Sequence, residues 1–105
     1  MLNDHVLEVA IFTVKDGFQG DIPALRAGLR ETLKSFPGLL EFCGYSPLNA
    51  DKHFADLAKW DCLANAEAVA RAFAEGDPRF AAYIDAIDSL VFMGHFSPEQ
   101  PAADD

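Results

Sequence analysis

Four short segments of the chain carry apolar residues almost without interruption. They are VLEVAIFTV (6–14), LLEFCGYS (39–46), HFADLAKWDCL (53–63) and SLVFMGHF (89–96). Their length and their content of β-branched and aromatic residues are typical of strands rather than helices. The pattern therefore predicts four β-strands.

After the first of these segments, apolar residues recur at steps of three and four, which predicts an amphipathic helix over 22–36. Asp21 is placed to cap its first turn, and the sequence FPG ends it. Between the apolar positions lie basic residues, among them Arg26 and Arg30. We expect these basic side chains to point outward into solvent.

A second helical region lies before the last strand and has two parts. The first part is expected over 66–75, with Asn65 as its cap and Gly76 as its end. The second part begins at Asp77 and Pro78, and its apolar side is expected to consist of Phe80, Tyr83, Ile84 and Ile87. Both parts therefore have a side that can pack against a sheet.

The predicted order is strand, helix, strand, strand, helix, strand, which is the βαββαβ pattern of an α+β, ferredoxin-like fold. In this fold, four antiparallel strands form one sheet and the helices cover one side of it. We expect the second and third strands to form a hairpin centred near Asn49 and Ala50. A single domain is predicted over 1–97, followed by a disordered acidic tail over 98–105.

The first strand does not alternate between apolar and polar residues, as a strand with one face in water should. From Val6 to Val14 only Glu8 and Thr13 interrupt the apolar run, and the last strand is nearly as apolar. The helices cover one face of the sheet, and in a monomer the other would remain as an exposed apolar patch. We therefore expect a homodimer in which two sheets pack face to face.

The charge of the chain narrows the range of partners. Eight Lys and Arg residues against 17 Asp and Glu residues give a net charge of −9, which disfavours nucleic acid and anionic membranes. No apolar run approaches the roughly 20 residues that span a bilayer. The first residues lack the pattern of a signal peptide, so a cytoplasmic location is expected, and Cys43 and Cys62 fit it as unpaired core thiols.

The same segments resemble the antibiotic-biosynthesis-monooxygenase-like (ABM) family of the dimeric α+β barrel superfamily. The likeness runs from about Val6 to Phe96 and is carried by VLEVAIFTVKDG, SFPGLLEFCGY, LAKWDCLANAEAVARAF and DPRFAAYIDAID. It implies a barrel formed by the two sheets of a dimer. Some members of this family oxidise anthrone- or quinol-like aromatics with no metal, flavin or heme, others degrade heme, and many have no assigned activity.

The resemblance also implies site residues. The aromatic-polyketide oxygenases of the family carry a Trp on the third strand, an Asn four residues earlier and an Arg further on. Here Trp60 matches the Trp, Asp56 replaces the Asn, and Arg79 lies near the Arg position. The Asn of the heme-degrading branch falls on an apolar residue of the first strand, and 65–87 contain no Trp or His, so heme degradation is not expected.

Polar residues on the first and last strands of the sequence suggest a second set of candidate site residues. Glu8 stands in an otherwise apolar strand, so it must be paired, protonated or at an opening. If buried, its raised pKa would suit a general base, and if marginal it is merely solvated. His95 is expected beside the first strand near His5, with His53 at the opposite end, and these histidines fall short of a metal site. Neither a metal nor a cofactor is predicted.

The aromatic candidates each have a structural interpretation beside the functional one. Trp60 could stack on a planar substrate and donate from its indole N–H, or it could fill the core between sheet and helices. Tyr45 and Tyr83 could orient a phenolic substrate, or they could bury a ring with the hydroxyl group in water.

We therefore expect a small dimer with an apolar cavity between sheet and helices that takes a small hydrophobic or aromatic molecule. The leading hypothesis is cofactor-independent monooxygenation of an anthrone- or quinol-like substrate, with Trp60 and Asp56 positioning it and Glu8 or His95 as the base. The alternative is a non-catalytic ligand-binding or stress-related module. The sequence does not separate either from an isomerase or decarboxylase acting on a small lactone or acid.

Overall fold

The structure is a computed structural model that describes residues 5–48 and 52–99. Its elements in chain order, with η for short 3-10 helices, are β1 (Val6–Val14), η1 (Gln19–Asp21), α1 (Ile22–Lys34), β2 (Leu39–Tyr45), β3 (His53–Trp60), α2 (Leu63–Ala74), η2 (Pro78–Phe80), α3 (Ala81–Ala86) and β4 (Ile87–Phe96). No helix in these ranges is long and apolar enough to cross a membrane. The predicted βαββαβ order is confirmed.

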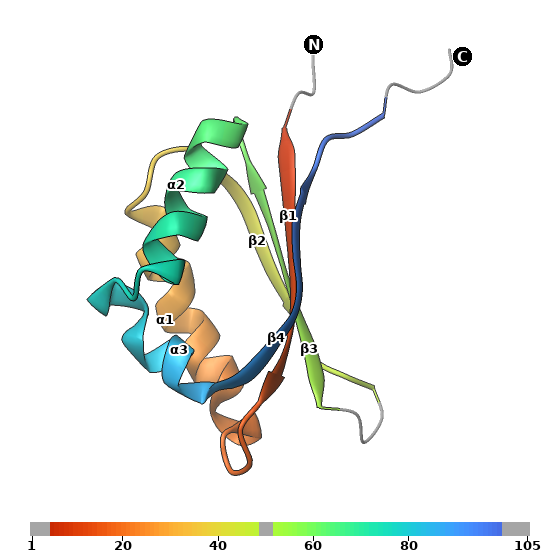
Figure 1. Cartoon of the computed structure of the whole chain (residues 1–105), viewed down its shortest axis with the longest axis vertical. Coiled ribbons are helices and arrows are strands. Elements are labelled where there is room, and N and C mark those ends of the chain that lie inside the picture. The colour runs from red at the N-terminus through yellow and green to blue at the C-terminus, as the bar shows by residue number, and fades with distance from the viewer. Residues whose placement is uncertain (1–4, 49–51, 100–105) are drawn as a thin grey trace.

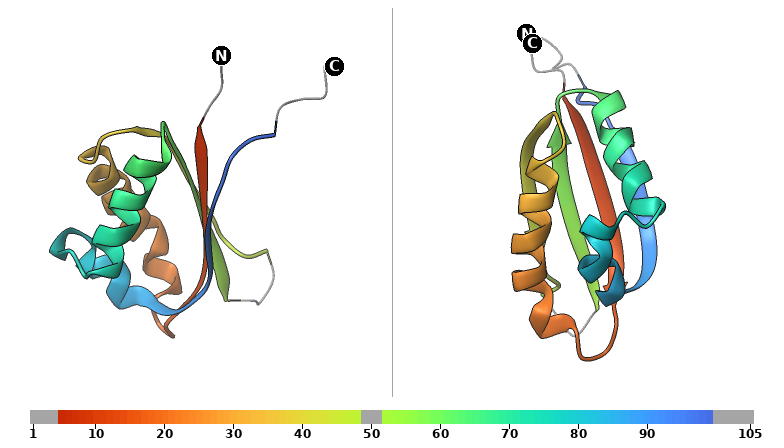
Figure 2. Two further views of the ribbon diagram at one scale, coloured as in Figure 1. Left: turned by 45° about the horizontal axis from the view of Figure 1, so that its top comes forward. Right: turned by 90° about the vertical axis from the view of Figure 1, so that its left-hand side faces the viewer.

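The four strands form one antiparallel sheet in the order β2-β3-β1-β4. All three α-helices lie on the same side of it, with α1 beside the pair formed by α2 and α3 (Figures 1 and 2). This is the predicted ferredoxin-like fold. The β2–β3 hairpin pairs Tyr45 with Ala55, while its turn at 49–51 and the tail from 100 onward lie outside the described residues.

The helices bury one face of the sheet. The largest fully buried side chains are Trp60, Phe12, Phe80, Ile22 and Val14, so strands and helices both contribute to one core. Because side chains alternate along a strand, Phe12 and Val14 place Glu8 and Ala10 on this same face. The helical face of the sheet therefore carries both the core and the acidic residue of β1.

The other face of the sheet is apolar along β1 and β4, and within the described residues nothing covers it. Ile11 of β1 pairs with Phe92, and Leu7 pairs with Phe96. The rings of Phe92 and Phe96 stack with centroids 6.1 Å apart, and they are 43% and 47% exposed. Gly94 stands between them, where a side chain would meet both rings. The uncovered apolar face that the sequence predicted is present.

Several local expectations were wrong. α2 begins at Leu63, before the expected cap Asn65, whose side chain instead donates to Asp61 at 2.8 Å. Cys62 is the residue before this helix and is exposed, so it is not a core thiol. β4 begins at Ile87, which ends the last helix at Ala86.

Candidate functional site

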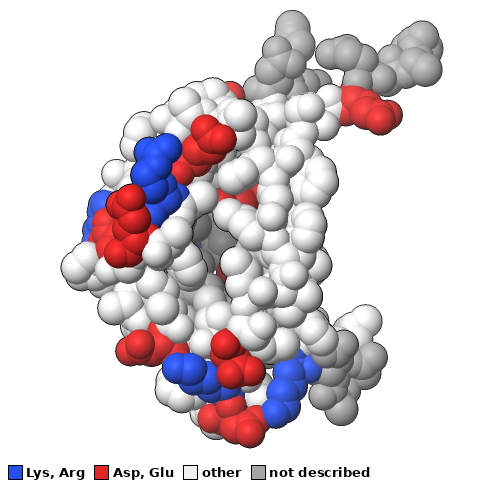
Figure 3. Space-filling view, viewed as in Figure 1, with Lys and Arg blue, Asp and Glu red and all other residues white. Residues whose placement is uncertain are grey.

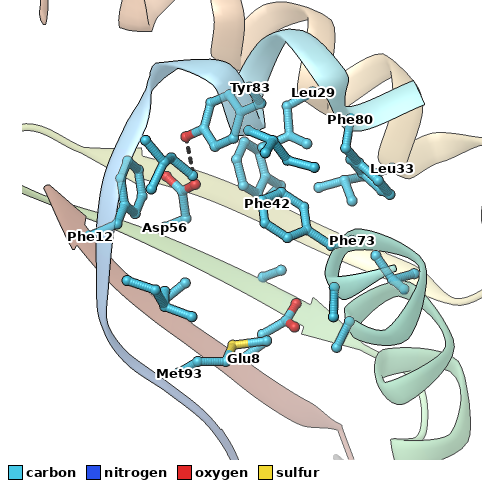
Figure 4. Close-up of a pocket in the computed structure, with 18 residues that line it drawn as sticks. Glu8, Phe12, Leu29, Leu33, Phe42, Asp56, Phe73, Phe80, Tyr83 and Met93 are labelled. Atoms are coloured by element: carbon cyan, nitrogen blue, oxygen red, sulfur yellow. Dashed lines mark hydrogen bonds between the residues drawn. The ribbon is translucent and has the colours of Figure 1, made fainter. Parts of the chain in front are cut away.

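A cavity of about 570 Å³ lies between the helical face of the sheet and the helices. The space-filling view shows it as a hollow between the helical layer and the sheet (Figure 3). Figure 4 shows the side chains around it, which come from every strand and from α1, α2 and α3. All but three of them are apolar, the exceptions being Glu8, Asp56 and Tyr83.

Small side chains create this space. Ala10 and Ala58 lie on the face of β1 and β3 that the helices cover, and Ala70 and Ala74 lie on α2. Because these side chains are short, they leave space between the sheet and the helix. Larger side chains form the walls: Leu29, Leu33, Phe42, Phe73 and Phe80. The volume lies within the range of roughly 300–1,000 Å³ that is usual for ligand pockets.

Glu8 reaches the cavity from the centre of the sheet. It is paired with Ala58 of β3 on one side and with His95 of β4 on the other. The indole Nε1–H of Trp60 donates to Glu8 Oε1 at 3.1 Å, and His95 Nε2 lies 3.3 Å from Glu8 Oε2. Its carboxylate is therefore held from two sides by neighbouring strands.

Burial raises the pKa of Glu8 above its ordinary value of 4.5, and the hydrogen bond from Trp60 and the nearby His95 oppose this shift in part. The side chain of Glu8 is only 13% exposed. Of the two interpretations that the sequence left open for Glu8, the structure therefore supports the buried one. A buried carboxyl group with a raised pKa is a better proton acceptor than an ordinary carboxylate.

Asp56 and Tyr83 form a second polar group on the cavity wall. The Tyr83 hydroxyl donates to Asp56 Oδ2 at 2.6 Å (Figure 4), and Arg26 Nε donates to Asp56 Oδ1 at 3.0 Å. Burial raises the pKa of Asp56, while these two hydrogen bonds and the charge of Arg26 oppose the shift. Burial and the charge of Asp56 also raise the pKa of Tyr83. The Asp56 carboxylate and the Tyr83 hydroxyl thus use each other as hydrogen-bond partners inside the protein.

Arg26 is the polar residue that sequence reasoning missed, because it was expected to point outward. Its side chain is only 11% exposed and also donates to the carbonyl groups of Tyr45 and Ala55. A side chain at Gly44 would collide with it. One signal was available: Arg26 lies four residues after Ile22 and three before Leu29, on the buried face of α1.

The remaining predicted site residues lie outside the cavity wall. Trp60 is fully buried in the core and does not line the cavity, and His95, which lies 3.3 Å from Glu8, does not line it either. Tyr45 is 55% exposed near the hairpin. Arg79 pairs with Asp77 at 2.8 Å and lies over the ring of Phe36, and neither Arg79 nor Phe36 lines the cavity. The structure therefore brings together Glu8, Trp60 and His95, and separately Asp56 and Tyr83.

The described residues contain no group of three His, Cys, Asp or Glu side chains that could hold a metal ion. Glu8 and His95 are two side chains of these types that lie together, and the third side chain at Glu8 is the indole of Trp60, which is not a metal ligand. The chemistry that this arrangement supports directly is proton transfer by a carboxyl group at an apolar cavity.

The fold and the cavity define a class of protein: a ferredoxin-like domain with a ligand-sized space between sheet and helices. No family model matches the chain, and no curated protein matches its sequence. Solved structures do match it over nearly the whole length, and the similarity lies in the fold.

One is a candidate antibiotic biosynthesis monooxygenase from Bordetella bronchiseptica, with 15% identity and a TM-score of 0.78 over 93% of this chain and 100% of that chain. Another is SnoaB, a cofactor-independent oxygenase from Streptomyces nogalater, with 22% identity and a TM-score of 0.72 over 93% and 96%. A third is a dimeric ferredoxin-like protein of unknown function from Thermobifida fusca, with 16% identity and a TM-score of 0.67 over 93% and 94%. The chain thus has the fold of structures described as antibiotic biosynthesis monooxygenases, as its resemblance to the ABM family implied.

Proposed function

We propose that this protein is a cofactor-independent monooxygenase of the ABM type that acts on a small aromatic, anthrone- or quinol-like substrate. The observation that carries the proposal is the carboxyl group of Glu8, which is buried at the wall of an otherwise apolar cavity and held by Trp60 and His95. The likeness in fold to an oxygenase that needs no cofactor supports it.

In this proposal the cavity supplies the binding and Glu8 supplies the base. The flat, electron-rich substrate lies among the apolar walls, which displace its water. Glu8 removes one proton from it, and the raised pKa of this carboxyl group brings it closer to that of its substrate. Trp60 and His95 do not touch the substrate and act as positioning residues, because they hold the two oxygens of Glu8.

The carbanion left behind then reacts with molecular oxygen without a cofactor. For an anthrone, the methylene carbon forms a bond to one oxygen atom and passes through a peroxide. Cleavage of the O–O bond leaves that carbon as a ketone, and its two hydrogens leave with the second oxygen atom as water. The substrate carbon is oxidised, both oxygen atoms are reduced, and no external reductant is needed.

We also propose that the protein works as a homodimer through the uncovered face of its sheet. The support is the apolar character of that face, with Phe92 and Phe96 exposed on it. Large exposed apolar patches are rare on soluble monomers. One of the solved structures with this fold is described as dimeric.

Oxygen uptake by metal-stripped protein tests the oxygenase proposal. We expect uptake with at least one member of a panel of anthrones and hydroquinones, persistence of that uptake with a chelator, and a loss of about a hundredfold or more in Glu8→Gln. Glu41→Gln is the matched control, because Glu41 lies on the surface and pairs with Lys59. Uptake that is equal in the wild type and in Glu8→Gln would remove Glu8 from the site.

A binding module without catalysis is the second candidate, and one observation favours it. Asp56 is already bonded to Tyr83 and Arg26, so among the described residues of the cavity wall Glu8 stands without a second free polar group that could complete a catalytic set. Saturable binding of aromatic ligands with no oxygen uptake across the panel would support this second candidate.

A further inference from the structure

The charges on the cavity wall all have one sign. Among the described residues, Glu8 and Asp56 line the cavity, and no Lys, Arg or His does. In Figure 3 the hollow is bordered mainly by uncharged side chains, while the blue Lys and Arg side chains gather away from it. An anion that entered would lose its hydration without meeting a positive group on the wall.

The two carboxylates differ in how far their charge is compensated. Asp56 accepts from the guanidinium group of Arg26 at 3.0 Å and from Tyr83 at 2.6 Å. Glu8 has an indole N–H on one oxygen and the ring of His95 near the other. Among the described residues Glu8 thus has no arginine beside it comparable to Arg26 beside Asp56, so no guanidinium group compensates its charge.

The described part of the cavity wall has free hydrogen-bond acceptors rather than free donors. Among the described residues, each oxygen of Glu8 has one hydrogen-bonding neighbour, whereas a carboxylate oxygen can accept two hydrogen bonds. The Tyr83 hydroxyl is the one side-chain donor on the described wall, and it is already directed to Asp56. The cavity therefore offers acceptors to a ligand rather than donors.

We propose that this cavity selects an uncharged planar aromatic molecule with a hydroxyl donor, which Glu8 holds, and excludes carboxylates, sulfonates and phosphates. The inference rests on the proposed function only in taking this cavity as the ligand site, and it does not require turnover. A hydroxyl group that donates to a carboxylate forms a charge-assisted hydrogen bond. An anion at the same place meets repulsion from Glu8 in surroundings of low polarity.

Three ligands of nearly equal shape test this selection: 2-naphthol, 2-methoxynaphthalene and 2-naphthoate. Their affinities at pH 8 are measured by displacement of the uncharged fluorescent probe N-phenyl-1-naphthylamine. We expect 2-naphthol to bind about tenfold more tightly than the methoxy compound, which lacks the donor, and 2-naphthoate to bind most weakly. In Glu8→Gln the gap between naphthol and naphthoate should narrow about tenfold or more, while Glu41→Gln should keep it.

Two further variants locate the binding. Ala70→Trp fills the cavity from α2 and should abolish displacement, and Ala74→Trp near its rim gives the same test with less disturbance of the core. Circular dichroism confirms that each variant is folded. Displacement that persists in both variants places the ligand elsewhere and overturns the proposal.

The outcomes separate this inference from the proposed function. Preference for naphthol without oxygen uptake supports the selection and rejects the oxygenase. Equal affinity for naphthoate and naphthol, or a gap that is unchanged in Glu8→Gln, overturns the selection even where anthrones are oxidised.

Discussion

Glu8 is the residue on which the proposed chemistry of this protein depends. It stands on the central strand β1, reaches an apolar cavity, and is held by Trp60 from one neighbouring strand and His95 from the other. Of the two interpretations that the sequence left open for Trp60, the structure supports the core residue, because its ring is fully buried and does not line the cavity. Its indole N–H donates to the carboxylate of Glu8, and in our proposal it positions that group.

The raised pKa of Glu8 predicts a pH dependence of stability. The unfolded chain releases this proton near pH 4.5, whereas the folded protein keeps it to higher pH. The free energy of unfolding of the wild type should therefore fall relative to that of Glu8→Gln as the pH rises through this window. Urea denaturation of both proteins between pH 4 and pH 8 measures the difference.

Glu41→Gln provides the control with the opposite sign. Lys59 lowers the pKa of Glu41, so any stability that Glu41 contributes is present above its ordinary pKa and is lost as the pH falls. A difference between the wild type and Glu8→Gln that stays flat with pH would contradict the burial of Glu8.

Replacement of Trp60 by Phe should raise the pKa of Glu8 further. The substitution keeps an aromatic ring but removes the N–H that stabilises the ionised carboxylate. A titration of the Glu8 carboxyl carbon by 13C NMR in both proteins measures the shift. A midpoint that stays in place or falls in Trp60→Phe would show that this hydrogen bond does not act on Glu8.

The helix α1 is joined to the sheet by Arg26 as well as by apolar packing. Its guanidinium group pairs with Asp56 and also donates to the carbonyl groups of Tyr45 and Ala55, at the hairpin end of β2 and β3. Gly44 makes room for this side chain. The ion pair between Arg26 and Asp56 thus helps to hold α1, which forms part of the cavity wall, against β3.

Arg26→Met should lower the free energy of unfolding by about 3–5 kcal/mol, because it leaves the buried Asp56 without its cation. Arg30→Met is the matched control: Arg30 lies one turn later and donates to the carbonyl group of Phe42 instead, so a loss near 1 kcal/mol is expected. Urea denaturation measures both changes. Equal losses in the two variants would deny Arg26 a special role.

At the level of elements, the sequence predicted the order of the strands and helices and which face of each is buried, because apolar periodicity determines both. It did not predict contacts that depend on strand register. Trp60 reaches Glu8 because β3 pairs Val6 with Trp60 and Ala58 with Glu8, and a shift by one residue would reverse both side chains. The outward prediction for Arg26 failed because a charged residue at a buried helix position is decided by its partner, here Asp56.

The whole molecule has one covered and one uncovered face of its sheet. Phe92 and Phe96 stack on the uncovered face, next to the apolar residues of β1. The cavity lies on the opposite face of the sheet, the one that the helices cover, so assembly through the uncovered face would leave the cavity wall intact. The proposed ligand binding and the proposed assembly thus use different faces of one sheet.

The double substitution Phe92→Asp and Phe96→Asp should convert a dimer into a monomer. Two charges on this face would lose their hydration on assembly, and a stable interface must bury roughly 1,200 Å² or more. Light scattering after size-exclusion chromatography measures the mass, with Leu63→Asp as a control because Leu63 is exposed at the start of α2. A wild type with the mass of one chain would contradict the proposed dimer.

Incorporation of oxygen from 18O₂ tests the central claim most directly. Wild-type, metal-stripped protein is incubated with an anthrone under 18O₂ in unlabelled water, and the quinone product is analysed by mass spectrometry. We predict one 18O atom in the product at a rate well above that of denatured protein, and a fall to that background in Glu8→Gln. Product oxygen that comes from water would contradict the monooxygenase proposal. Labelling as fast in Glu8→Gln as in the wild type would contradict the role of Glu8 as its base.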